Sequence, residues 1–555
     1  MFRRRTLGLP VVLILGACED PTALDRVTGW TTANRVEFTT ARPAEKLMQS
    51  LSTEFPGFGG YFLDGTGALV VYVADSAQNH LLRGRIADML DHGELQTHRS
   101  RIRSIVVRRA QFDFASLAEW RERITNGMLG QVAGVVSVDA DEQANRVTIG
   151  LDKDLATHRR GEVIQRLRQL GIPIGAIQIV LRVRPNPNVG RVATPPLLLP
   201  ANATLTDVAS PVVAGYKVFV GGSYCTLGPT ILHNGNPAAL TSSHCTYTMY
   251  GADAVGHMET ADQEDIAVES IDPASFACLY GPGVFPCRNS DAALFTMFSG
   301  VPFRRGAIAH TVNLSYSQSP GSLNVDQNVN FVPVTYVLNP NQAFSGEWLI
   351  KTGLTTGSTT GPVTSTCTDI LGSDGYVRRC SGEATYFSDY ADSGAPVWES
   401  NTSSAFLLGI HWGNGGGTSS FSYFTEAMAE IGGTYNATTD ITVSPSTLSG
   451  SISTQRPQLS WTGVTVNNSP TSTTTYTVRR RTWSGSSQSY TEIDHNVLVT
   501  QSQFSVKDFE RVVDVYYGST MPAANIDRVD YYILANNYGV TSVSNPVYYR
   551  LKPVM

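Results

Sequence analysis

Three side chains in the middle of this chain have the types that acyl transfer by a serine requires. His244, Asp291 and Ser393 follow in that order, each within a short stretch of distinctive sequence. Such a site needs a hydroxyl activated by an imidazole, an anion that orients the imidazole, and amide donors for the oxyanion. The three residues therefore predict acyl transfer with Ser393 as nucleophile, His244 as general base and Asp291 as the orienting anion.

The stretches around His244 and Ser393 resemble motifs of chymotrypsin-like serine proteases. Thr241-Ser242-Ser243-His244-Cys245 is similar to the family's Thr-Ala-Ala/Gly-His-Cys, and Asp392-Ser393-Gly394-Ala395-Pro396-Val397 to its Asp-Ser-Gly-Gly-Pro-Val. Lys351 to Gly361 resembles the Lys-x-Gly-x-Thr-Thr-Gly pattern of the bacterial streptogrisins and alpha-lytic protease. The resemblance covers Val212 to Gly433 and implies a chymotrypsin-like double β-barrel endopeptidase. An esterase is disfavoured, because the Gly-x-Ser-x-Gly elbow of α/β-hydrolases is missing around Ser393.

Two aspartates are candidates for the third partner, since Asp265 and Asp291 each precede a strand-like run. Cys287-Arg288-Asn289-Ser290-Asp291-Ala292 resembles the Cys-Arg-x-Ser-Asp-Ala segment of the bacterial relatives. Asp291 also lies 47 residues after His244, which leaves room for intervening strands. Asp291 is therefore favoured, and Asp265 is the alternative.

The resemblance implies an oxyanion hole made by the backbone amides of Ser393 and Ala391. Here the sequence departs from the family, which has glycine at the position of Ala391. Alanine resists a positive φ angle, so the hole could be misformed until substrate binds. The alternative to an endopeptidase is thus a weak or inactive protease-fold surface protein that only binds.

Substrate-binding residues are expected after the nucleophile. The family places a strand that pairs with the substrate backbone at Gly409 to Gly413, which indicates His411, Trp412 and Gly413 as contacts, with Ser388 near the base of the side-chain pocket. No acidic residue falls near that base, so a preference for Lys or Arg is not expected there. His411-Trp412-Gly413 also resembles glutamyl endopeptidases, in which a pocket histidine binds an acidic side chain.

The cysteines predict a disulfide-bonded, exported protein. Of seven cysteines, Cys18 lies in the N-terminal segment, and the other six could form three disulfides in 15 ways. The resemblance implies the pairs Cys225 to Cys245, Cys278 to Cys287, and Cys367 to Cys380. The histidines are scattered and the cysteines are expected to be paired, so neither a metal site nor a cofactor is predicted.

The N-terminal sequence predicts a targeting segment. Arg3 to Arg5 precede an apolar run from Leu7 to Leu15. Leu15-Gly16-Ala17-Cys18 resembles a bacterial lipoprotein signal in which Cys18 is lipidated, and an ordinary signal peptide is the alternative. No later stretch is long and apolar enough to span a bilayer. The expected location is therefore extracellular or at the cell surface, with the protein an outer-membrane lipoprotein before processing. The net charge of -6 gives no reason to propose a nucleic acid partner.

The chain is long enough for several domains. We expect a signal peptide at residues 1–18, an α+β prosegment-like domain at 19–190, a linker with the processing site at 191–211, the protease at 212–436, and a fibronectin III- or immunoglobulin-like β-sandwich at 437–555. In the first domain, patterns predict a hairpin at 61–73, helices near 81–90, 117–124 and 163–170, and strands at 105–107, 135–138, 147–151 and 177–183. No internal repeat is evident.

Bacterial relatives often carry a prosegment that assists folding and then inhibits the enzyme, and residues 58–75 and 135–151 resemble its strand pairs. The expected partners are thus protein or peptide substrates and the chain's own prosegment. If Cys18 is lipidated, the anchor belongs to the prosegment, and a cut in the linker would free the protease from the membrane. The C-terminal sandwich is expected to bind a surface or polymer, or to act as a spacer.

Overall fold

The computed structural model describes residues 42–99, 101–187, 204–252, 256–280, 283–316, 318–326, 330–401 and 404–439, and most of 448–552. The expected signal peptide, Cys18 and the first part of the expected linker lie outside these residues. Strands dominate, and the helices are few. No helix among the described residues is long and apolar enough to cross a membrane.

The N-terminal region, residues 42–187, has the same order of elements twice. Its first half contains α1 (Lys46–Glu54), β1 (Phe58–Leu63), β2 (Ala68–Val73), α2 (Asn79–His92) and β3 (Ser104–Arg109). Its second half contains α3 (Phe114–Met128), β4 (Val135–Asp141), β5 (Arg146–Asp152), α4 (Ala156–Gln169) and β6 (Ile177–Arg182). In each half an antiparallel hairpin is followed by a helix and a third, parallel strand. The predicted elements are confirmed, but this repeated fold was not visible as a sequence repeat.

The central region, residues 204–439, contains two large sheets. The first has the order β10-β9-β13-β14-β17-β12-β11-β26. Its strands are β9 (Lys217–Val220), β10 (Ser223–Thr226), β11 (Thr230–His233), β12 (Asn236–Thr241), β13 (His257–Glu259), β14 (Asp265–Ile271), β17 (Ala293–Met297) and β26 (Tyr435–Asn436). Ala239, Phe295 and Ala267 are among the fully buried residues between these strands.

The second sheet of the central region has the order β15-β16-β22-β25-β24-β23-β20-β21. These strands are β15 (Phe276–Tyr280), β16 (Gly283–Arg288), β20 (Trp348–Gly353), β21 (Gly357–Leu371), β22 (Val377–Ala384), β23 (Pro396–Asn401), β24 (Ser404–Gly415) and β25 (Thr418–Tyr423). β8 (Val212–Ala214), β18 (Phe303–Ala309) and β19 (Phe331–Val337) join it through the β19–β24 pairing. A helix, α5 (Phe424–Ile431), follows β25 and buries Phe424, Ala427, Met428 and Ile431.

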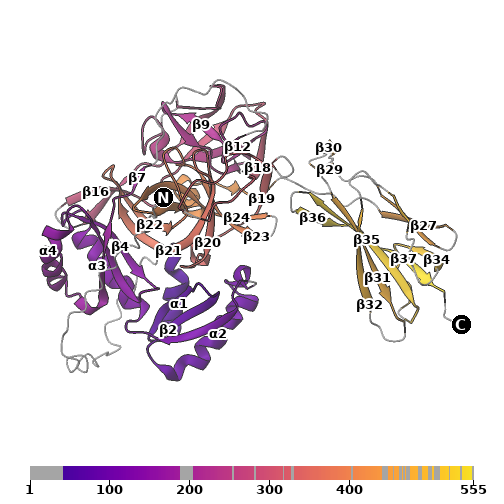
Figure 1. Cartoon of the computed structure of the whole chain (residues 1–555), viewed down its shortest axis with the longest axis horizontal. Coiled ribbons are helices and arrows are strands. Elements are labelled where there is room, and N and C mark those ends of the chain that lie inside the picture. Colours follow the sequence, from indigo (N-terminus) through magenta and orange to yellow (C-terminus); the bar gives the residue numbers. More distant parts are fainter. Residues whose placement is uncertain are drawn as a thin grey trace, which may run out of the picture.

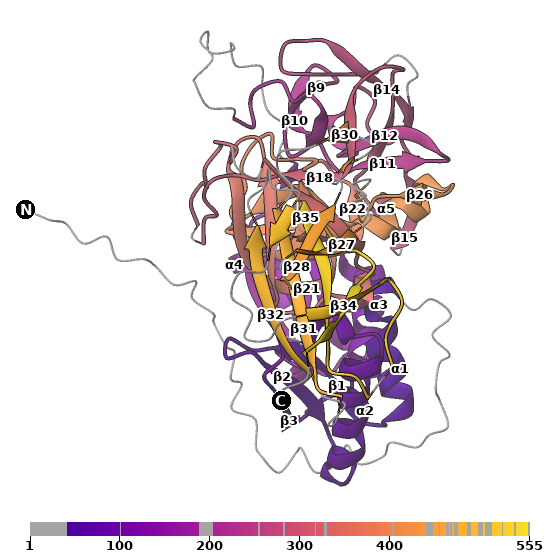
Figure 2. The ribbon, with the colours of Figure 1, turned by 90° about the vertical axis from the view of Figure 1, so that its right-hand side faces the viewer.

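The N-terminal and central regions share one continuous sheet. β4 pairs with β21 in antiparallel fashion, so β5 and β6 extend the second sheet beyond β21. At this junction the Arg42 guanidinium donates to both carboxylate oxygens of Asp369, at 2.6 and 2.9 Å, in a buried environment. A short strand, β7 (Asn186–Pro187), pairs with the far end of β24. Figures 1 and 2 show the N-terminal region (indigo and purple) alongside the central strands.

The C-terminal region forms strands of two main sheets, as a β-sandwich requires. One sheet has the order β27-β28-β33, and the other β32-β31-β35-β37-β34 with β36 on β35. The strands are β27 (Leu448–Ser453), β28 (Arg456–Trp461), β31 (Thr475–Trp483), β32 (Tyr490–Val497), β33 (Gln503–Ser505), β34 (Val513–Gly518), β35 (Arg528–Asn537), β36 (Val540–Val543) and β37 (Val547–Leu551), besides a small pair, β29 (Thr465–Val466) and β30 (Ser469–Pro470). Figure 1 shows them as a separate group at the right, which faces the viewer in Figure 2.

Candidate active site

The structure brings His244, Asp291 and Ser393 together in one buried chain of hydrogen bonds. His244 lies on the short turn after β12, Asp291 directly before β17, and Ser393 on the loop before β23. The Nδ1 atom of His244 lies 2.9 Å from Oδ2 of Asp291, and its Nε2 lies 2.8 Å from Oγ of Ser393. The backbone amide of His244 also donates to Oδ1 of Asp291 at 3.1 Å, which fixes the loop and the ring together. The alternative, Asp265, instead lies at the surface, where its carboxylate pairs with His257 at 2.9 Å.

Asp291 is held by two residues that sequence reasoning missed, Arg378 and Tyr250. The Nε atom of Arg378 donates to Oδ2 of Asp291 at 2.7 Å, and the Tyr250 hydroxyl donates to the same oxygen at 3.3 Å. Burial by itself would raise the pKa of Asp291, but the charges of Arg378 and His244 outweigh it and hold the pKa well below its usual range. Asp291 is therefore ionised at neutral pH.

Arg378 is itself fully buried and contacts two aromatic residues, Trp412 and Tyr250. Its guanidinium carbon lies 4.3 Å from the centre of the Trp412 ring, and its NH2 group donates to the Tyr250 hydroxyl at 2.6 Å. The Asp374 carboxylate, 2.6 Å from the same NH2 group, supplies a second negative charge. No signal in the sequence pointed to this arginine, because it is separated from Asp291 by 87 residues.

The Lys351 to Gly361 motif forms a cradle for Asp392, the residue before Ser393. Lys351 Nζ lies 2.9 Å from Oδ2 of Asp392, and the Thr356 hydroxyl donates to that oxygen at 2.6 Å. The amides of Thr355 and Thr356 donate to the other oxygen, at 3.0 and 3.3 Å. Lys351 and Asp392 are both fully buried, so this ion pair fixes the loop that carries Ser393.

Ala391 has a positive φ angle, the conformation that alanine adopts less readily than glycine. Its φ is 72°, while its carbonyl accepts a hydrogen bond of 2.8 Å from the Thr226 hydroxyl. The amide of Thr226 in turn donates to the carbonyl of Ser393 at 2.8 Å. The alanine therefore adopts the left-handed backbone at a cost of about 1–2 kcal/mol, and the loop is held in this shape by contacts with β10.

Three of the expected substrate-binding residues have buried side chains: Ser388, His411 and Trp412. The Ser393 hydroxyl lies 3.2 Å from the carbonyl of Trp412 on β24, and the Ser388 and Ser419 hydroxyls lie 2.7 Å apart. His411 is fully buried, and its Nδ1 lies 3.2 Å from the Tyr386 hydroxyl. Burial lowers the pKa of His411 to about 3, so its ring is uncharged at neutral pH.

β24 already carries a peptide strand in this structure. β7 lies antiparallel to it, with Asn186 opposite Asn414 and Pro187 opposite Gly413. A Cβ atom on Gly413 would lie 2.8 Å from the carbonyl oxygen of Asn186, so this close approach needs glycine. Ser373 anchors the same segment from the opposite side, since its hydroxyl donates to Oδ1 of Asn186 at 2.7 Å and its amide to the carbonyl of Pro185 at 3.0 Å.

Two of the three expected disulfides lie among the residues that the structure describes. Cys225 is bonded to Cys245, which ties β10 to the turn carrying His244, and Cys367 is bonded to Cys380, which ties β21 to β22. Cys287 is also disulfide-bonded. The side chain of Cys278, its expected partner, lies outside the described residues.

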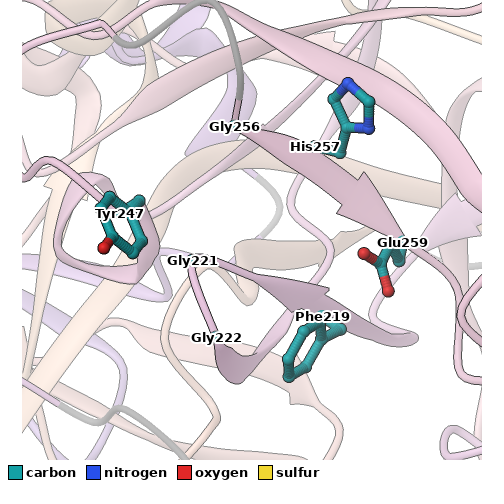
Figure 3. Close-up of a pocket in the computed structure, with 7 residues that line it drawn as sticks. All are labelled: Phe219, Gly221, Gly222, Tyr247, Gly256, His257 and Glu259. Atoms are coloured by element: carbon teal, nitrogen blue, oxygen red, sulfur yellow. The ribbon is translucent and has the colours of Figure 1, made fainter.

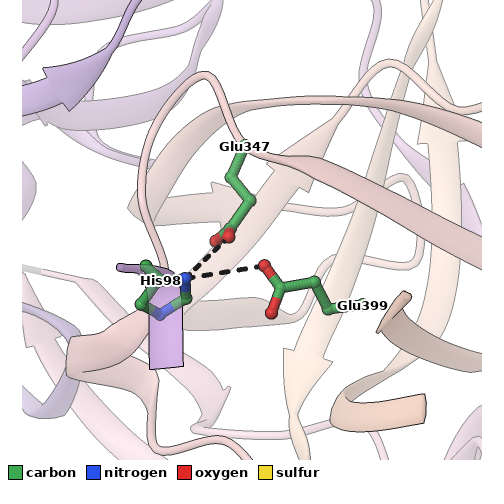
Figure 4. Close-up of side chains that lie close together, drawn as sticks. All are labelled: His98, Glu347 and Glu399. Carbon is green, nitrogen blue, oxygen red and sulfur yellow. Dashed lines mark hydrogen bonds and ion pairs between the residues drawn. The ribbon is translucent and has the colours of Figure 1, made fainter. Parts of the chain in front are cut away.

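Among the described residues, one cluster has the residue types of a metal site, and it involves none of the triad. His98, Glu347 and Glu399 are buried where the N-terminal region meets β20 and β23, with His98 Nδ1 2.9 Å from Glu347 and 3.6 Å from Glu399 (Figure 4). The Arg101 guanidinium contacts both carboxylates. It takes the place that a cation would need, so the cluster is better described as an ionic contact between the two regions.

No protein-family model and no curated protein matches the chain. Among solved structures, a glutamic acid specific serine protease described as using a novel histidine triad in substrate binding is 22% identical, over 39% of this chain and 96% of its own, with a TM-score of 0.29. The alpha-lytic protease homolog N4 is 16% identical over 39% of this chain and 95% of its own, with a TM-score of 0.29. The FN1–FN3 domains of chicken CNTN1 are 10% identical over 59% of this chain and 99% of their own, with a TM-score of 0.17. The two proteases are bacterial and chymotrypsin-like, and the resemblance is coarse.

Proposed function

We propose that this chain is a serine endopeptidase that acts through Ser393, His244 and Asp291. The observation that carries the proposal is the unbroken hydrogen-bonded path from Ser393 Oγ through the His244 ring to a buried, ionised Asp291. A buried carboxylate beside a histidine beside a serine is the arrangement that makes a hydroxyl nucleophilic. Its construction from three separate loops, each braced by further contacts, favours a preorganised site over a chance contact.

In the proposed mechanism, Ser393 Oγ attacks the carbonyl carbon of the scissile peptide bond while its proton passes to Nε2 of His244. Asp291 holds the Nδ1–H tautomer and stabilises the imidazolium that forms. The proton then passes to the leaving amine, and water repeats the cycle to release the acyl group. The amides of Ser393 and Ala391 would stabilise the oxyanion, and removal of one such donor typically costs about 2.7–4 kcal/mol.

We also propose that the protein is made as a precursor whose N-terminal region inhibits it. The pairing of β7 with β24 supports this, because β7 lies where a substrate backbone would have to pair. The fully buried Glu383, which receives a hydrogen bond of 2.8 Å from Arg182, adds a contact between the two regions. A cut within residues 191–211 would separate the regions, and if Cys18 is lipidated, that cut would also release the enzyme from the membrane. The disulfides agree with an extracellular location.

The alternative is a protease-fold surface protein that binds without turnover. Alanine at position 391 favours it, since the strained backbone there adds an energetic cost that glycine would avoid. The two candidates differ in whether a covalent acyl-enzyme forms at Ser393.

The test is to express the wild type and Ser393→Ala without residues 1–18 in an oxidising compartment, and to follow casein cleavage and the N-terminus of each product. A self-processing protease predicts that the wild type cleaves casein and loses its N-terminal region, while Ser393→Ala stays intact and inert. If both proteins are folded, intact and inert, the binding protein is favoured. An active enzyme that keeps residues 19–183 on one continuous chain would refute the precursor proposal but not the protease.

A further inference from the structure

A cavity built by two regions of the molecule takes no part in the proposed mechanism. It has a volume of about 350 Å³ and lies where the N-terminal region meets β20, β21 and β23. Another cavity, of about 320 Å³, lies between the β9–β10 hairpin and β13 and is lined in part by Tyr247 (Figure 3). The larger one, here called the junction cavity, is lined by Leu63 and Arg101 of the N-terminal region and, among others, by Tyr316, Glu347 and Trp348 of the central region.

Two exposed aromatic side chains line the junction cavity. Trp348 is 51% exposed and Tyr316 is 71% exposed, and their ring centres lie 6.2 Å apart with the planes inclined at 52°. The backbone of β21 fixes both, since Trp348 pairs with Pro362 of that strand. The amide of Ser315, next to Tyr316, donates to the carbonyl of Ser358 at 3.0 Å. Two aromatic rings that a sheet holds side by side at the surface are a feature of binding sites.

β20 turns opposite faces to the junction cavity and to the proposed active site. Successive side chains of a strand point to opposite sides of its sheet. Trp348 and Ile350 line the cavity, whereas Lys351 contacts Asp392 on the loop of Ser393. The cavity is therefore separate from the site of the proposed mechanism, and its occupant need not be a substrate.

The charge of Arg101, which is partly exposed in the cavity, is compensated by two buried carboxylates. Its guanidinium donates to Glu347 at 2.9 Å, contacts Glu399, and donates to the carbonyl of Ser400 at 2.5 Å. His98 lies behind, against both carboxylates (Figure 4). A guanidinium has five N–H donors, so Arg101 keeps donors for a ligand. Its paired charge attracts an anion little, and a cation would meet the guanidinium before the carboxylates.

A neutral sugar ring has the chemistry that these features require. The C–H groups of a pyranose with equatorial hydroxyls form a flat apolar face that packs on an aromatic ring, while the hydroxyls at its rim make hydrogen bonds. The volume of the cavity lies at the lower end of ligand pockets, which span about 300–1,000 Å³. We propose that the junction cavity binds a neutral glycan with equatorial hydroxyls, of the β-1,4-glucan type. A sugar unit would pack on Trp348 and Tyr316 and accept hydrogen bonds from Arg101.

The proposed glycan site is complete only while the two regions are together. Leu63 and Arg101 are contributed by the N-terminal region, and the amide of Leu63 donates to the carbonyl of Ser345 at 2.8 Å. A Cβ atom on the next residue, Gly346, would overlap the carbonyl oxygen of Leu63, so the two backbones are in direct contact. The uncut chain is therefore the form that binds the glycan.

Titration of the full chain tests the assignment without turnover. Ser393→Ala is titrated with cellotriose and with the glucosamine trimer of the same linkage, in which an ammonium group replaces each 2-hydroxyl, and the dissociation constants are measured by calorimetry. Cellotriose is expected to bind at least about threefold more tightly, since Arg101 repels the ammonium groups. Hexaproline, a rigid peptide of a kind that also packs on aromatic rings, is the probe for a protein ligand and is expected to bind more weakly than cellotriose.

Matched variants in the same background locate the site. Trp348→Ala and Tyr316→Ala, on different segments, are each expected to weaken cellotriose binding about five- to tenfold through the loss of one stacked ring. Tyr247→Ala removes an exposed ring outside the junction cavity and is expected to keep the affinity. Arg101→Lys is expected to weaken binding about threefold, because lysine lacks the planar fork of donors, and Arg103→Lys, an exposed neighbour outside the lining, to leave it unchanged.

Four results would overturn the glycan site. They are a folded chain that does not bind cellotriose, tighter binding of the glucosamine trimer, tighter binding of hexaproline, and an affinity for cellotriose that neither Trp348→Ala nor Tyr316→Ala changes. None of them depends on the activity of Ser393. The proposed function can therefore fail while glycan binding stands, and the reverse.

Discussion

Lys351→Met removes the only cation that contacts the Asp392 carboxylate among the described residues, and its effect measures how strongly the nucleophile loop depends on that ion pair. Both side chains are 0% exposed, so water cannot replace the lost charge. Burial would raise the pKa of Asp392, but the Lys351 charge and the Thr356 hydroxyl outweigh it and lower that pKa. The carboxylate is thus held as an anion mainly by its partners.

The expected cost follows from leaving that anion buried without its counter-ion. Removal of one partner of a buried ion pair typically destabilises a protein by about 3–5 kcal/mol, whereas removal of both is often close to neutral. Four hydrogen bonds to the carboxylate remain, three from Thr355 and Thr356 and one of 3.0 Å from the amide of Asp389, so we expect the lower end, about 3 kcal/mol. The double variant Lys351→Met/Asp392→Asn is expected to recover more than half of this loss.

The assay is urea unfolding followed by tryptophan fluorescence, in the Ser393→Ala background so that self-cleavage cannot contribute. Lys153→Met is the matched control, since Lys153 is exposed and its replacement is expected to change the free energy of unfolding by less than about 0.5 kcal/mol. A loss of under about 1 kcal/mol for Lys351→Met, or a double variant less stable than the single one, would refute the reasoning.

Three further predictions follow. Asp291→Asn is expected to lower kcat for casein cleavage by about 10⁴-fold and Asp265→Asn to leave it unchanged; equal losses would contradict the assignment of the orienting anion. Ala391→Gly is expected to raise the stability measured by thermal melting by about 1 kcal/mol, because glycine adopts the φ of 72° without strain. The variant is expected to keep the kcat of the wild type, because the backbone already has this φ. An inactive wild type and an active Ala391→Gly variant would contradict this prediction. Burial, and then the charge of Asp141, raise the pKa of Glu142 to about 8, although the hydrogen bond from the Thr366 hydroxyl acts in the opposite direction. The unfolded chain therefore loses this proton near pH 4.5, whereas the folded protein keeps it until about pH 8. The stability of full-length Ser393→Ala should therefore fall over this range, by at most about 1.4 kcal/mol per pH unit for this group, and a slope unchanged in Glu142→Gln would refute it.

The candidate site could be predicted from the sequence where it depends on short motifs. The stretches around His244 and Ser393 carry local backbone requirements, such as the turn of the nucleophile loop, and these leave a readable pattern. The Lys351 motif could also be recognised in the sequence. Its physical role could not be predicted, because its contact with Asp392 joins residues 41 positions apart.

The parts that could not be predicted all depend on contacts between segments far apart in the sequence. Arg378 and Tyr250 are ordinary residues of a strand and a loop, and only the folded chain brings them to Asp291. The pairing of β4 with β21 follows no local rule either, because any exposed strand edge can accept another strand. The repeat within the N-terminal region is likewise a repeat of topology, and different side chains can build the same hairpin, helix and strand.

Labelling with a fluorophosphonate probe tests the central claim most directly, because the probe reacts covalently with a serine only where the hydroxyl is activated. The account predicts that the folded wild type is labelled at Ser393, that heat-denatured protein is not, and that Ser393→Ala and His244→Ala both lose the label. A folded wild type that stays unlabelled after removal of its N-terminal region, or a label that persists in Ser393→Ala, would contradict it.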